Sequence, residues 1–443
     1  MKVLVAGAGI GGLVSAGKLA ELGLEVEVLE KSPSIEKMRY DWHDDVAPKI
    51  FRRLGIEIPK EHWKKAAWTF CTTGENTVRE MQQDETDPDL SIERGPLNKV
   101  LADYATTRGA KIRFGVSVTG PITKDNRVIG LMVDGKEEYA DFVLDSAGVD
   151  SVVRSNLPEE FKIIKAPNKD EVFEVYRAFV RKTPGVPEPK YTNKVYMMHM
   201  NKPGISWSVV DVSDPTCMNV LVGRIAELPK DEFEAAWADL KEYNPLISDE
   251  VVRGGYFCRI PVRFPATRMI ANGYALIGDA AFMTIPMLGS GIASSMLSAS
   301  LLAETVADSI QKGIKDEAIF DAENLWSYQY KVFQEFGAQH LGVDAIKRWL
   351  LNCEYIDWLF GSPVLSNADL SASSSGGELK MTTAQKLQKV KACGLKSLPR
   401  LMQLLPMLNQ QKKASKLGKA IPKEYNDKAI DNWEAKIKKV MYK

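Results

Sequence analysis

Cysteine and histidine are scarce in this sequence, and neither is arranged as a metal site requires. The 443 residues include five cysteines and four histidines. No two cysteines form a Cys-x-x-Cys pair, and the histidines are scattered along the chain. We therefore expect no disulfide framework, no zinc or iron–sulfur site and no other bound metal. This use of cysteine fits a reducing compartment, and we expect a cytoplasmic protein.

Long hydrophobic runs and a net charge are also absent. No continuous apolar run reaches the roughly eighteen positions that a membrane-spanning helix needs. The chain starts with Met1 and Lys2 and passes directly into a strand pattern, so we expect no signal peptide. The 58 Lys and Arg residues balance the 58 Asp and Glu residues, and we expect no nucleic-acid partner.

The balanced charge conceals an uneven distribution along the chain. Residues 380–443 hold 16 Lys and Arg against 4 Asp and Glu, a net charge of 16 − 4 = +12, so residues 1–379 carry −12. Between residues 380 and 420, ten basic residues and no acidic ones alternate with leucines. The pattern predicts basic amphipathic helices, interrupted at Pro399 and Pro406, which lie on an anionic membrane or pack on an acidic protein surface. Residues 371–377, SASSSGG, are expected to form a flexible linker before this tail.

The first thirty residues combine a strand, a glycine-rich turn and a helix. Val3 to Ala6 form an apolar run, and the next glycines, Gly7, Gly9 and Gly12, have the spacing Gly-x-Gly-x-x-Gly. In this pattern the first glycine makes a tight turn, the second admits a pyrophosphate, and the third lets helix and strand pack closely. A second strand ends at Glu30, where a carboxylate can accept hydrogen bonds from ribose hydroxyls. The stretch predicts a dinucleotide site with the pyrophosphate at the helix N-terminus.

A second pattern of strand, turn and helix covers residues 274–311. Asp279 follows an apolar strand, at the strand end where ligands bind in open α/β sheets. Gly289 and Gly291 allow close approach to the backbone, and Ile292 opens a helix whose N-terminus favours an anionic group. These features suit a reduced flavin, whose negative charge gathers near N1 and O2.

Aromatic and acidic residues are unusually dense after the second strand. The cluster consists of Tyr40, Asp41, Trp42 and His43. It is followed by Asp44 and Asp45, which we expect to cap the helix that comes next. Because the chain leaving the second strand runs close to the dinucleotide, the cluster is a candidate for contact with the redox centre.

Residues 161–265 are rich in strand patterns broken by turn signals. They predict a sheet that covers the cofactor from one side and holds the substrate. Trp207, in one of these strands, either lines an apolar substrate channel or packs in the core. His199, in Tyr-Met-Met-His-Met, is interpreted as a sheet residue and not as a catalyst.

Taken together, residues 1–350 resemble the FAD-dependent enzymes of the p-hydroxybenzoate hydroxylase fold. The resemblance implies that the ADP half of FAD is held by Gly7, Gly9, Gly12, Glu30 and Lys31. It implies that Arg94, at the start of a helix, contacts the cofactor, and that Asp279 binds its ribityl chain. The motif Gly-Asp-Ala-Ala with a later Pro and Gly-x-Gly-Ile then corresponds to Gly278, Asp279, Pro286, Gly289, Gly291 and Ile292.

The fold that this resemblance implies is of the α/β class. It has a Rossmann-like FAD-binding domain, an interleaved and mainly antiparallel substrate sheet, and a helical C-terminal region. We expect the FAD-binding domain in residues 1–160 and 266–315, the substrate sheet in 161–265, a helical region in 316–370 and a basic helical tail in 378–443.

Within that fold, the middle of the chain is similar to the geranylgeranyl reductase group. The similarity rests on residues 202–207 (KPGISW), residues 219–223 (NVLVG), the pair Gly254-Gly255 and Pro261. The chain departs from the PGYxWxFP strand of that group at residues 205–206 and 209–210. It also has Phe282 where the related hydroxylases carry a histidine, which disfavours a monooxygenase.

The resemblance implies that reduced FAD transfers a hydride to a C=C bond of a hydrophobic, isoprenoid-like substrate. An external donor, NAD(P)H or a ferredoxin-like protein, would reduce the FAD. The candidate proton donors are His43, Asp41 and Tyr40, and the candidate substrate contacts are Trp42 and Trp207. Two alternatives stay open: an NAD(P)H-dependent monooxygenase of aromatic substrates, and a non-catalytic flavin protein that carries electrons at a membrane. The basic tail would supply a peripheral membrane contact.

Overall fold

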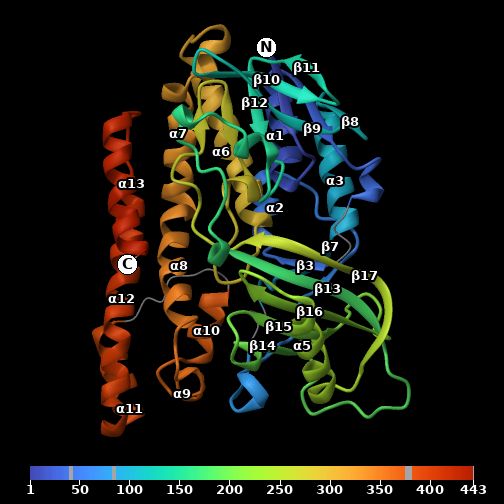
Figure 1. Ribbon diagram of the computed structural model, residues 1–443, viewed down its shortest axis with the longest axis vertical. Coiled ribbons are helices and arrows are strands. Elements are labelled where there is room, and N and C mark those ends of the chain that lie inside the picture. Colours follow the sequence, from blue (N-terminus) through green and yellow to red (C-terminus); the bar gives the residue numbers. More distant parts are fainter. Residues whose placement is uncertain (39–42, 82–85, 375–381, 443) are drawn as a thin grey trace.

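A six-stranded sheet organises the first part of the fold (Figure 1). The computed structural model describes residues 1–38, 43–81, 86–374 and 382–442. The strand order is β18-β19-β12-β1-β2-β8, and all neighbours are parallel except β18 and β19. The strands are β1 (Lys2–Ala6), β2 (Glu25–Glu30), β8 (Lys111–Phe114), β12 (Phe142–Asp145), β18 (Ile270–Ala271) and β19 (Tyr274–Leu276). The strand order reverses beside β1, which is where open α/β sheets bind their ligands.

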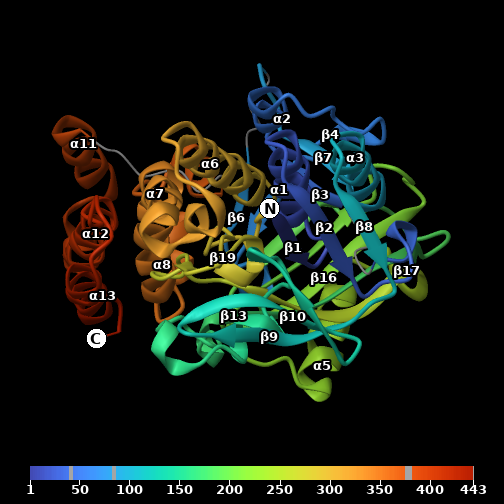
Figure 2. The ribbon, with the colours of Figure 1, turned by 90° about the horizontal axis from the view of Figure 1, so that it is seen from above.

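Both faces of this sheet are covered, which explains the apolar runs of its central strands β1, β12 and β19. One face packs against the helices α1 (Ile10–Glu21), α3 (Arg94–Thr107) and α6 (Ile292–Gln311). The other face carries a small antiparallel sheet, as Figure 2 shows, made of β9 (Val118–Lys124), β10 (Arg127–Val133) and β11 (Lys136–Tyr139).

A second, seven-stranded sheet has the order β17-β13-β16-β15-β14-β5-β6. Its strands are β5 (Thr69–Cys71), β6 (Val78–Glu80), β13 (Val172–Lys182), β14 (Lys194–Met197), β15 (Ile205–Val210), β16 (Cys217–Ile225) and β17 (Ile247–Pro261). One face packs on helix α5 (Lys230–Tyr243), through an apolar cluster that includes Val220 and Leu240. The other face turns toward the first sheet. The predicted sheet of residues 161–265 is therefore incomplete, because β5 pairs with β14 across more than a hundred residues, and no local pattern signals such a pairing.

A third, small sheet has the order β3-β7-β4, with β3 (His43–Val46), β4 (His62–Lys64) and β7 (Leu90–Glu93). The prediction that Asp44 and Asp45 cap a helix is wrong, because both lie in β3 and the helix α2 (Lys49–Leu54) begins only after Pro48. Their carboxylates pair with basic side chains of other elements instead, Asp44 with Arg94 and Asp45 with Lys65.

The C-terminal third is helical. It contains α7 (Ala322–Val332), a π-helical turn (Phe333–Gly337), α8 (Ala338–Leu350), α9 (Ile356–Gly361), α10 (Asn367–Ser374), α11 (Thr383–Cys393), α12 (Leu398–Lys419) and α13 (Asp427–Met441). Figure 1 shows α11, α12 and α13 as a column beside α8. The column packs tightly on α8, because a Cβ at Gly418 would lie 2.5 Å from Cα of Ala338.

Two expectations for this region are wrong. Residues 371–374 of the predicted linker lie in α10, whereas residues 375–377 lie outside the described residues. Pro406 does not interrupt the tail, because α12 continues through it. The proline removes the hydrogen bond to the carbonyl of Met402, but that residue is exposed and water can replace the bond. Within the described residues, no helix is both long and apolar enough to cross a membrane.

Candidate functional site

The glycine turn between β1 and α1 leaves room for a ligand against the backbone. Gly7 has φ +94°, and a Cβ on it would lie 2.7 Å from O of Ser146. A Cβ on Gly12 would lie 2.5 Å from O of Gly7, so only glycine permits this packing. Helix α1 starts after Gly9 with no side-chain cap and no acidic residue in its first turn. The N–H group of Gly12 donates to Oγ of Ser146 at 3.1 Å, which leaves the N–H groups of Ile10 and Gly11 open to an anion.

The carboxylate of Glu30 is fixed beside this turn. Its Oε2 accepts a hydrogen bond from N of Ala8 at 2.9 Å, and its Oε1 accepts one from N of Ser32 at 2.8 Å. Each oxygen keeps a further lone pair for a ribose hydroxyl. Lys31, the other residue predicted at this point, is exposed directly after β2.

The second predicted motif begins at the end of β19. Gly278 and Asp279 open a 3₁₀ turn, Gly278–Ala281. Asp279 is largely but not completely buried, and its carboxylate has no hydrogen bond from the described residues. Its surroundings raise the pKa of Asp279 to about 6: burial is the main cause, the charge of Arg94 opposes it, and the charge of Asp44 adds to it. A carboxylate in this position can accept hydrogen bonds from the hydroxyl groups of a ligand.

The remainder of this motif leads into helix α6. Pro286 is buried, and Gly289 has φ +72°. A Cβ on Gly291 would lie 3.3 Å from Oδ1 of Asp279. Ile292 is the first residue of α6, whose N-terminus has no side-chain cap and no acidic residue in its first turn. A second helix N-terminus is thus open to an anion beside Asp279.

Arg94 opens α3, as predicted, and connects to the seven-stranded sheet through Asp44. Nη1 of Arg94 donates a hydrogen bond to Oδ2 of Asp44 at 2.8 Å. Oδ1 of Asp44 lies 3.3 Å from Nη1 of Arg177, a buried residue of β13. Burial lowers the pKa of Arg177, and the charge of Asp44 opposes that effect. Asp44, in β3 of the small sheet, therefore connects the start of α3 to the seven-stranded sheet through two arginines.

His43, a predicted proton donor, is a buried residue of β3, where the small three-stranded sheet meets the seven-stranded sheet. Its Nε2 lies 2.8 Å from Oε2 of Glu93 and 3.2 Å from Oδ1 of Asp211. Arg253 contacts both of these carboxylates as well. Burial by itself would lower the pKa of His43, but the hydrogen bonds with Asp211 and Glu93 outweigh it and raise that pKa. His43 is thus one member of a buried ionic cluster, while Tyr40, Asp41 and Trp42 lie outside the described residues.

Trp207 lies on the face of the seven-stranded sheet that turns toward the first sheet. Its ring meets that of Trp68 edge-on, with the centroids 5.7 Å apart, and the guanidinium carbon of Arg177 lies 5.6 Å from its ring centre. Ile205, two residues earlier on β15, shares this face. Ile205 lines the pocket described next, whereas Trp207 does not.

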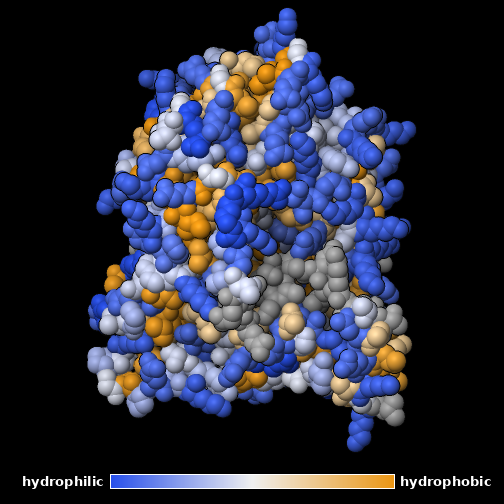
Figure 3. All heavy atoms as spheres, turned by 180° about the vertical axis from the view of Figure 1, so that it is seen from behind, coloured by the Kyte–Doolittle hydropathy of each residue, from blue (hydrophilic) through white to orange (hydrophobic). Residues whose placement is uncertain are grey.

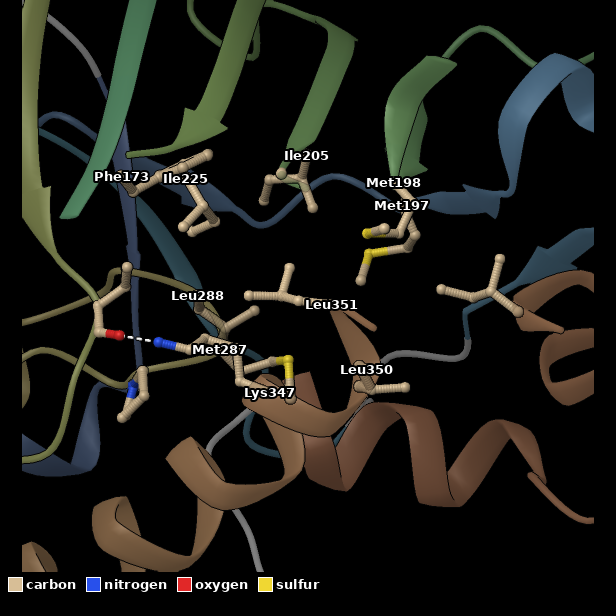
Figure 4. Close-up of a pocket in the computed structure, with 14 residues that line it drawn as sticks. Phe173, Met197, Met198, Ile205, Ile225, Met287, Leu288, Lys347, Leu350 and Leu351 are labelled. Carbon is tan, nitrogen blue, oxygen red and sulfur yellow. Dashed lines mark hydrogen bonds between the residues drawn. The ribbon is translucent and has the colours of Figure 1, made fainter. Parts of the chain in front are cut away.

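An apolar pocket lies between this sheet face and the C-terminal helices (Figure 4). About 500 Å³ of it, the mouth included, is empty of protein atoms. The loop after the Gly-Asp-Ala-Ala turn contributes to its wall, so the pocket adjoins the predicted flavin-binding motif. Its lining is Phe173, Met197, Met198, Gly204, Ile205, Ile225, Val262, Pro286, Met287, Leu288, Lys347, Leu350, Leu351 and Ile356.

Lys347 is the one titratable residue among these lining residues. Its stem lies along the pocket, and its Nζ donates a hydrogen bond to O of Val262 (Figure 4). Nζ also lies 2.9 Å from Oδ1 of Asp344, a carboxylate with no exposure to solvent. Within the described part of the chain, the ammonium of Lys347 thus makes one hydrogen bond and one ion pair.

These residues fit FAD. Two uncapped helix N-termini suit phosphate and an anionic ring, and the carboxylates of Glu30 and Asp279 suit hydroxyl groups at two separate points. Sequence reasoning found these residues because they belong to two local motifs. It missed Asp44, Arg177 and Lys347, although Arg177 stands as a lone charge in the apolar strand VYRAFV.

A family model described as FAD binding domain matches residues 1–322. A digeranylgeranylglycerophospholipid reductase of Sulfolobus acidocaldarius is 24% identical over 459 residues, which cover 99% of this chain and 97% of the relative. A 6-hydroxynicotinate 3-monooxygenase of Pseudomonas fluorescens is 28% identical, but over 35% of this chain and 43% of the relative.

A solved structure gives the same result for the fold. It is that of a geranylgeranyl bacteriochlorophyll reductase-like protein from Thermoplasma acidophilum, with a TM-score of 0.71 and 17% identity. The match covers 91% of this chain and 99% of that protein. The predicted resemblance, the α/β fold class and FAD as the cofactor are confirmed.

Proposed function

Because the chain belongs to the family of proteins with an FAD binding domain and is an FAD-dependent oxidoreductase, we propose that it reduces a C=C bond of an isoprenoid lipid. The apolar pocket beside Pro286 carries this proposal, because its lining offers contacts for a hydrocarbon and one charged group. The named substrates of the relatives support a geranylgeranyl chain on a glycerophospholipid.

We propose that the two motifs hold FAD at its two ends. The adenosine and pyrophosphate half would contact Gly7, Gly9, Gly12, Glu30 and Lys31. The flavin half would contact Arg94, Gly278, Asp279, Pro286, Gly289, Gly291 and Ile292. The open N–H groups at the N-termini of α1 and α6 support this assignment, as does the carboxylate of Asp279, which has no hydrogen bond from the described residues.

When bound and reduced by NAD(P)H or a ferredoxin-like protein, the flavin supplies a hydride for the double bond. The chain supplies an apolar pocket whose hydrocarbon lining would orient the alkene beside the flavin motif. It also supplies the proton for the second carbon. His43, Asp41 and Tyr40 are the donors proposed from the sequence, and Trp42 and Trp207 the proposed substrate contacts.

Lys347 is a further candidate donor, supported by its place in the pocket wall. A general acid must reach the receiving carbon directly or through one water. Of the described residues that line the pocket, only Lys347 carries a transferable proton. Asp344 would then act as a positioning residue, because it holds the ammonium at the pocket end formed by Val262.

An anaerobic single-turnover experiment tests the proposal. Chemically reduced enzyme is mixed without oxygen with a geranylgeranyl lipid, and the return of the oxidised flavin spectrum is followed. We expect reoxidation together with a lipid product heavier by two hydrogen atoms. Oxygen uptake that depends on NAD(P)H and an aromatic compound would instead support the monooxygenase. Reoxidation by quinone or a protein partner alone, without conversion of any alkene, would support the electron carrier.

The membrane contact of the basic tail is part of the same proposal. A lipid substrate resides in a bilayer, and the tail combines leucines with ten basic residues between positions 380 and 420. An anionic membrane attracts such segments.

A further inference from the structure

Exposed apolar side chains concentrate on α11 and the first half of α12. Thirteen large hydrophobic residues are exposed in the described part of the chain, and five of them lie between positions 387 and 405. They are Leu387, Val390, Leu398, Met402 and Leu405, with exposed fractions from 39% to 57%. Figure 3 shows apolar side chains on the edge of the molecule where α12 lies. We name these five residues the outer stripe.

Helix α12 is apolar on two opposite sides. Leu401, Leu404 and Met407 are buried and pack in one cluster with residues of α8 and α9. Leu398, Met402 and Leu405 follow the spacing i, i+4, i+7 and point away from that cluster. The inner side accounts for the packing of the helix, so the outer stripe requires another explanation.

The surroundings of the outer stripe are basic. Lys391 and Lys396 are exposed near it, and the sequence has no acidic residue between positions 380 and 420. Another lysine, Lys389, fixes α11 to the body of the protein, through O of Val364 at 2.9 Å and the carboxylate of Asp369. The surface therefore offers leucine-type side chains and uncompensated cations on helices that are held in place.

We propose that α11 and the first half of α12 dock on the surface of an anionic phospholipid membrane. The outer stripe enters the boundary between headgroups and acyl chains, and the flanking cations contact lipid phosphates. This surface gives the membrane contact of the proposed function a defined location. A lipid surface matches both features at once, because it presents phosphate above hydrocarbon along the whole length of the stripe.

The docking surface connects to the pocket through apolar side chains. The buried side of α12 belongs to the same hydrophobic cluster as Ile356, Met198 and Met287, which line the pocket. Figure 1 shows α9, α11 and the lower part of α12 at the same end of the molecule as β14 and β15. One continuous hydrophobic cluster thus lies between α12 and the pocket.

Flotation with vesicles tests the docking surface without any turnover. Full-length protein with FAD is mixed with phosphatidylcholine vesicles, with or without about one third phosphatidylglycerol, at low and high salt. We expect binding to the mixed vesicles at low salt, and weaker binding at high salt or without the anionic lipid. The double variant M402Q/L405Q should bind about tenfold more weakly, because two inserted side chains lose their burial.

The control is V251Q/V252Q, which makes the same kind of change at two exposed residues of β17. It should float like the unchanged protein, and all proteins should keep their flavin spectrum and melting temperature. Equal flotation of M402Q/L405Q and the unchanged protein, or no flotation of either, would overturn the proposal. A dimer in solution that only M402Q/L405Q dissociates would also overturn it, since a second copy would then cover the stripe. A failure of alkene reduction with intact flotation would contradict the proposed function alone.

Discussion

The ammonium of Lys347 lies 2.9 Å from Oδ1 of Asp344 in the wall of a pocket whose other described lining residues are uncharged. Burial alone would raise the pKa of Asp344, but the charges of Lys347 and Arg348 lower it. Asp344 therefore favours its ionised form inside the protein, and it holds the Lys347 side chain at the wall of the pocket.

Replacing Lys347 by methionine should slow the reoxidation of reduced enzyme by substrate about a hundredfold, because the proton donor is lost. Reduction of the flavin by dithionite and the affinity for lipid should change little, since methionine keeps the length and the apolar stem. Stopped-flow absorbance of the flavin separates these steps. If K347M is reoxidised as fast as the unchanged protein, Lys347 is not the proton donor, and His43, Asp41 and Tyr40 remain the candidates.

The matched control for K347M is Leu351→Met, which alters the same pocket wall without changing its charge. Arg348 still contacts Asp344 after either substitution, with Nε 3.2 Å from Oδ2, so the carboxylate keeps a partner. A slow reoxidation in both variants would indicate a packing effect. A slow reoxidation in K347M alone would indicate that the proton donor has been lost.

The ionic cluster around His43 should make stability depend on pH. The pKa of folded His43 is raised above its unfolded value of about 6.5. Its stabilising effect is therefore complete below pH 6.5 and is lost as pH rises through the folded pKa. Burial by itself would raise the pKa values of Glu93 and Asp211, but the hydrogen bonds from His43, together with those from Arg253 to Glu93 and from Ser213 to Asp211, lower them, so their contribution is lost at acid pH.

The variant His43→Gln should lower the free energy of unfolding at pH 6 by about 3 kcal/mol, because it leaves buried carboxylates with one partner fewer. It should also remove the decline in stability above pH 6.5. Melting curves between pH 5 and 9 measure both effects, with His62→Gln, an exposed histidine of β4, as the control. A parallel decline in H43Q and the unchanged protein would place the titrating group elsewhere.

The two cofactor motifs could be predicted because each is local. Glycine spacing, an apolar strand and a helix start are contiguous in sequence, and Gly12 and Asp279 were found from them. The cluster of His43, Glu93 and Asp211 joins three elements that are up to about 170 residues apart. His43 stood out in the sequence, but Glu93 and Asp211 looked like ordinary polar residues, because only the pairing of the sheets brings them to His43.

Burial explains the remaining differences. Lys347 stands beside Arg348 in a helix that reads as amphipathic, and nothing in the sequence separates the buried cation from an exposed one. The burial of the leucines of α12 could not be predicted either, because their spacing gives a single broad apolar pattern in the sequence. The structure divides that pattern into Leu401 and Leu404 inside and Met402 and Leu405 outside.

The affinity of the protein for FAD should fall below about pH 6. The pKa of Asp279 is raised to about 6 without a ligand, and only the ionised carboxylate accepts hydrogen bonds at both oxygens. If FAD binds that form, its affinity should decrease up to tenfold for each pH unit below 6. Asp279→Asn should bind FAD more weakly at pH 8 and show no such pH dependence. Titration of the apoprotein with FAD measures the affinity, and Asp103→Asn, a change at an exposed residue, is the control. The same pH profile in D279N and in the unchanged protein would exclude Asp279 as the titrating group.

The packing at Gly12 makes the sharpest test of the glycine turn. In Gly12→Ala the new Cβ would lie 2.5 Å from O of Gly7 and 2.9 Å from Oγ of Ser146, and the backbone oxygen cannot move without opening the turn. We expect overpacking to lower the free energy of unfolding by about 2 kcal/mol. The free energy of FAD binding should fall by far more than this, because the turn that faces the pyrophosphate is displaced. Gly95→Ala is the matched control, since its Cβ would meet no atom within 4 Å in helix α3. Isothermal titration with FAD and thermal melting should leave G95A unchanged. Normal FAD binding by G12A would mean that the turn at Gly7 adapts, and that the close contact between α1 and β1 does not control the cofactor site.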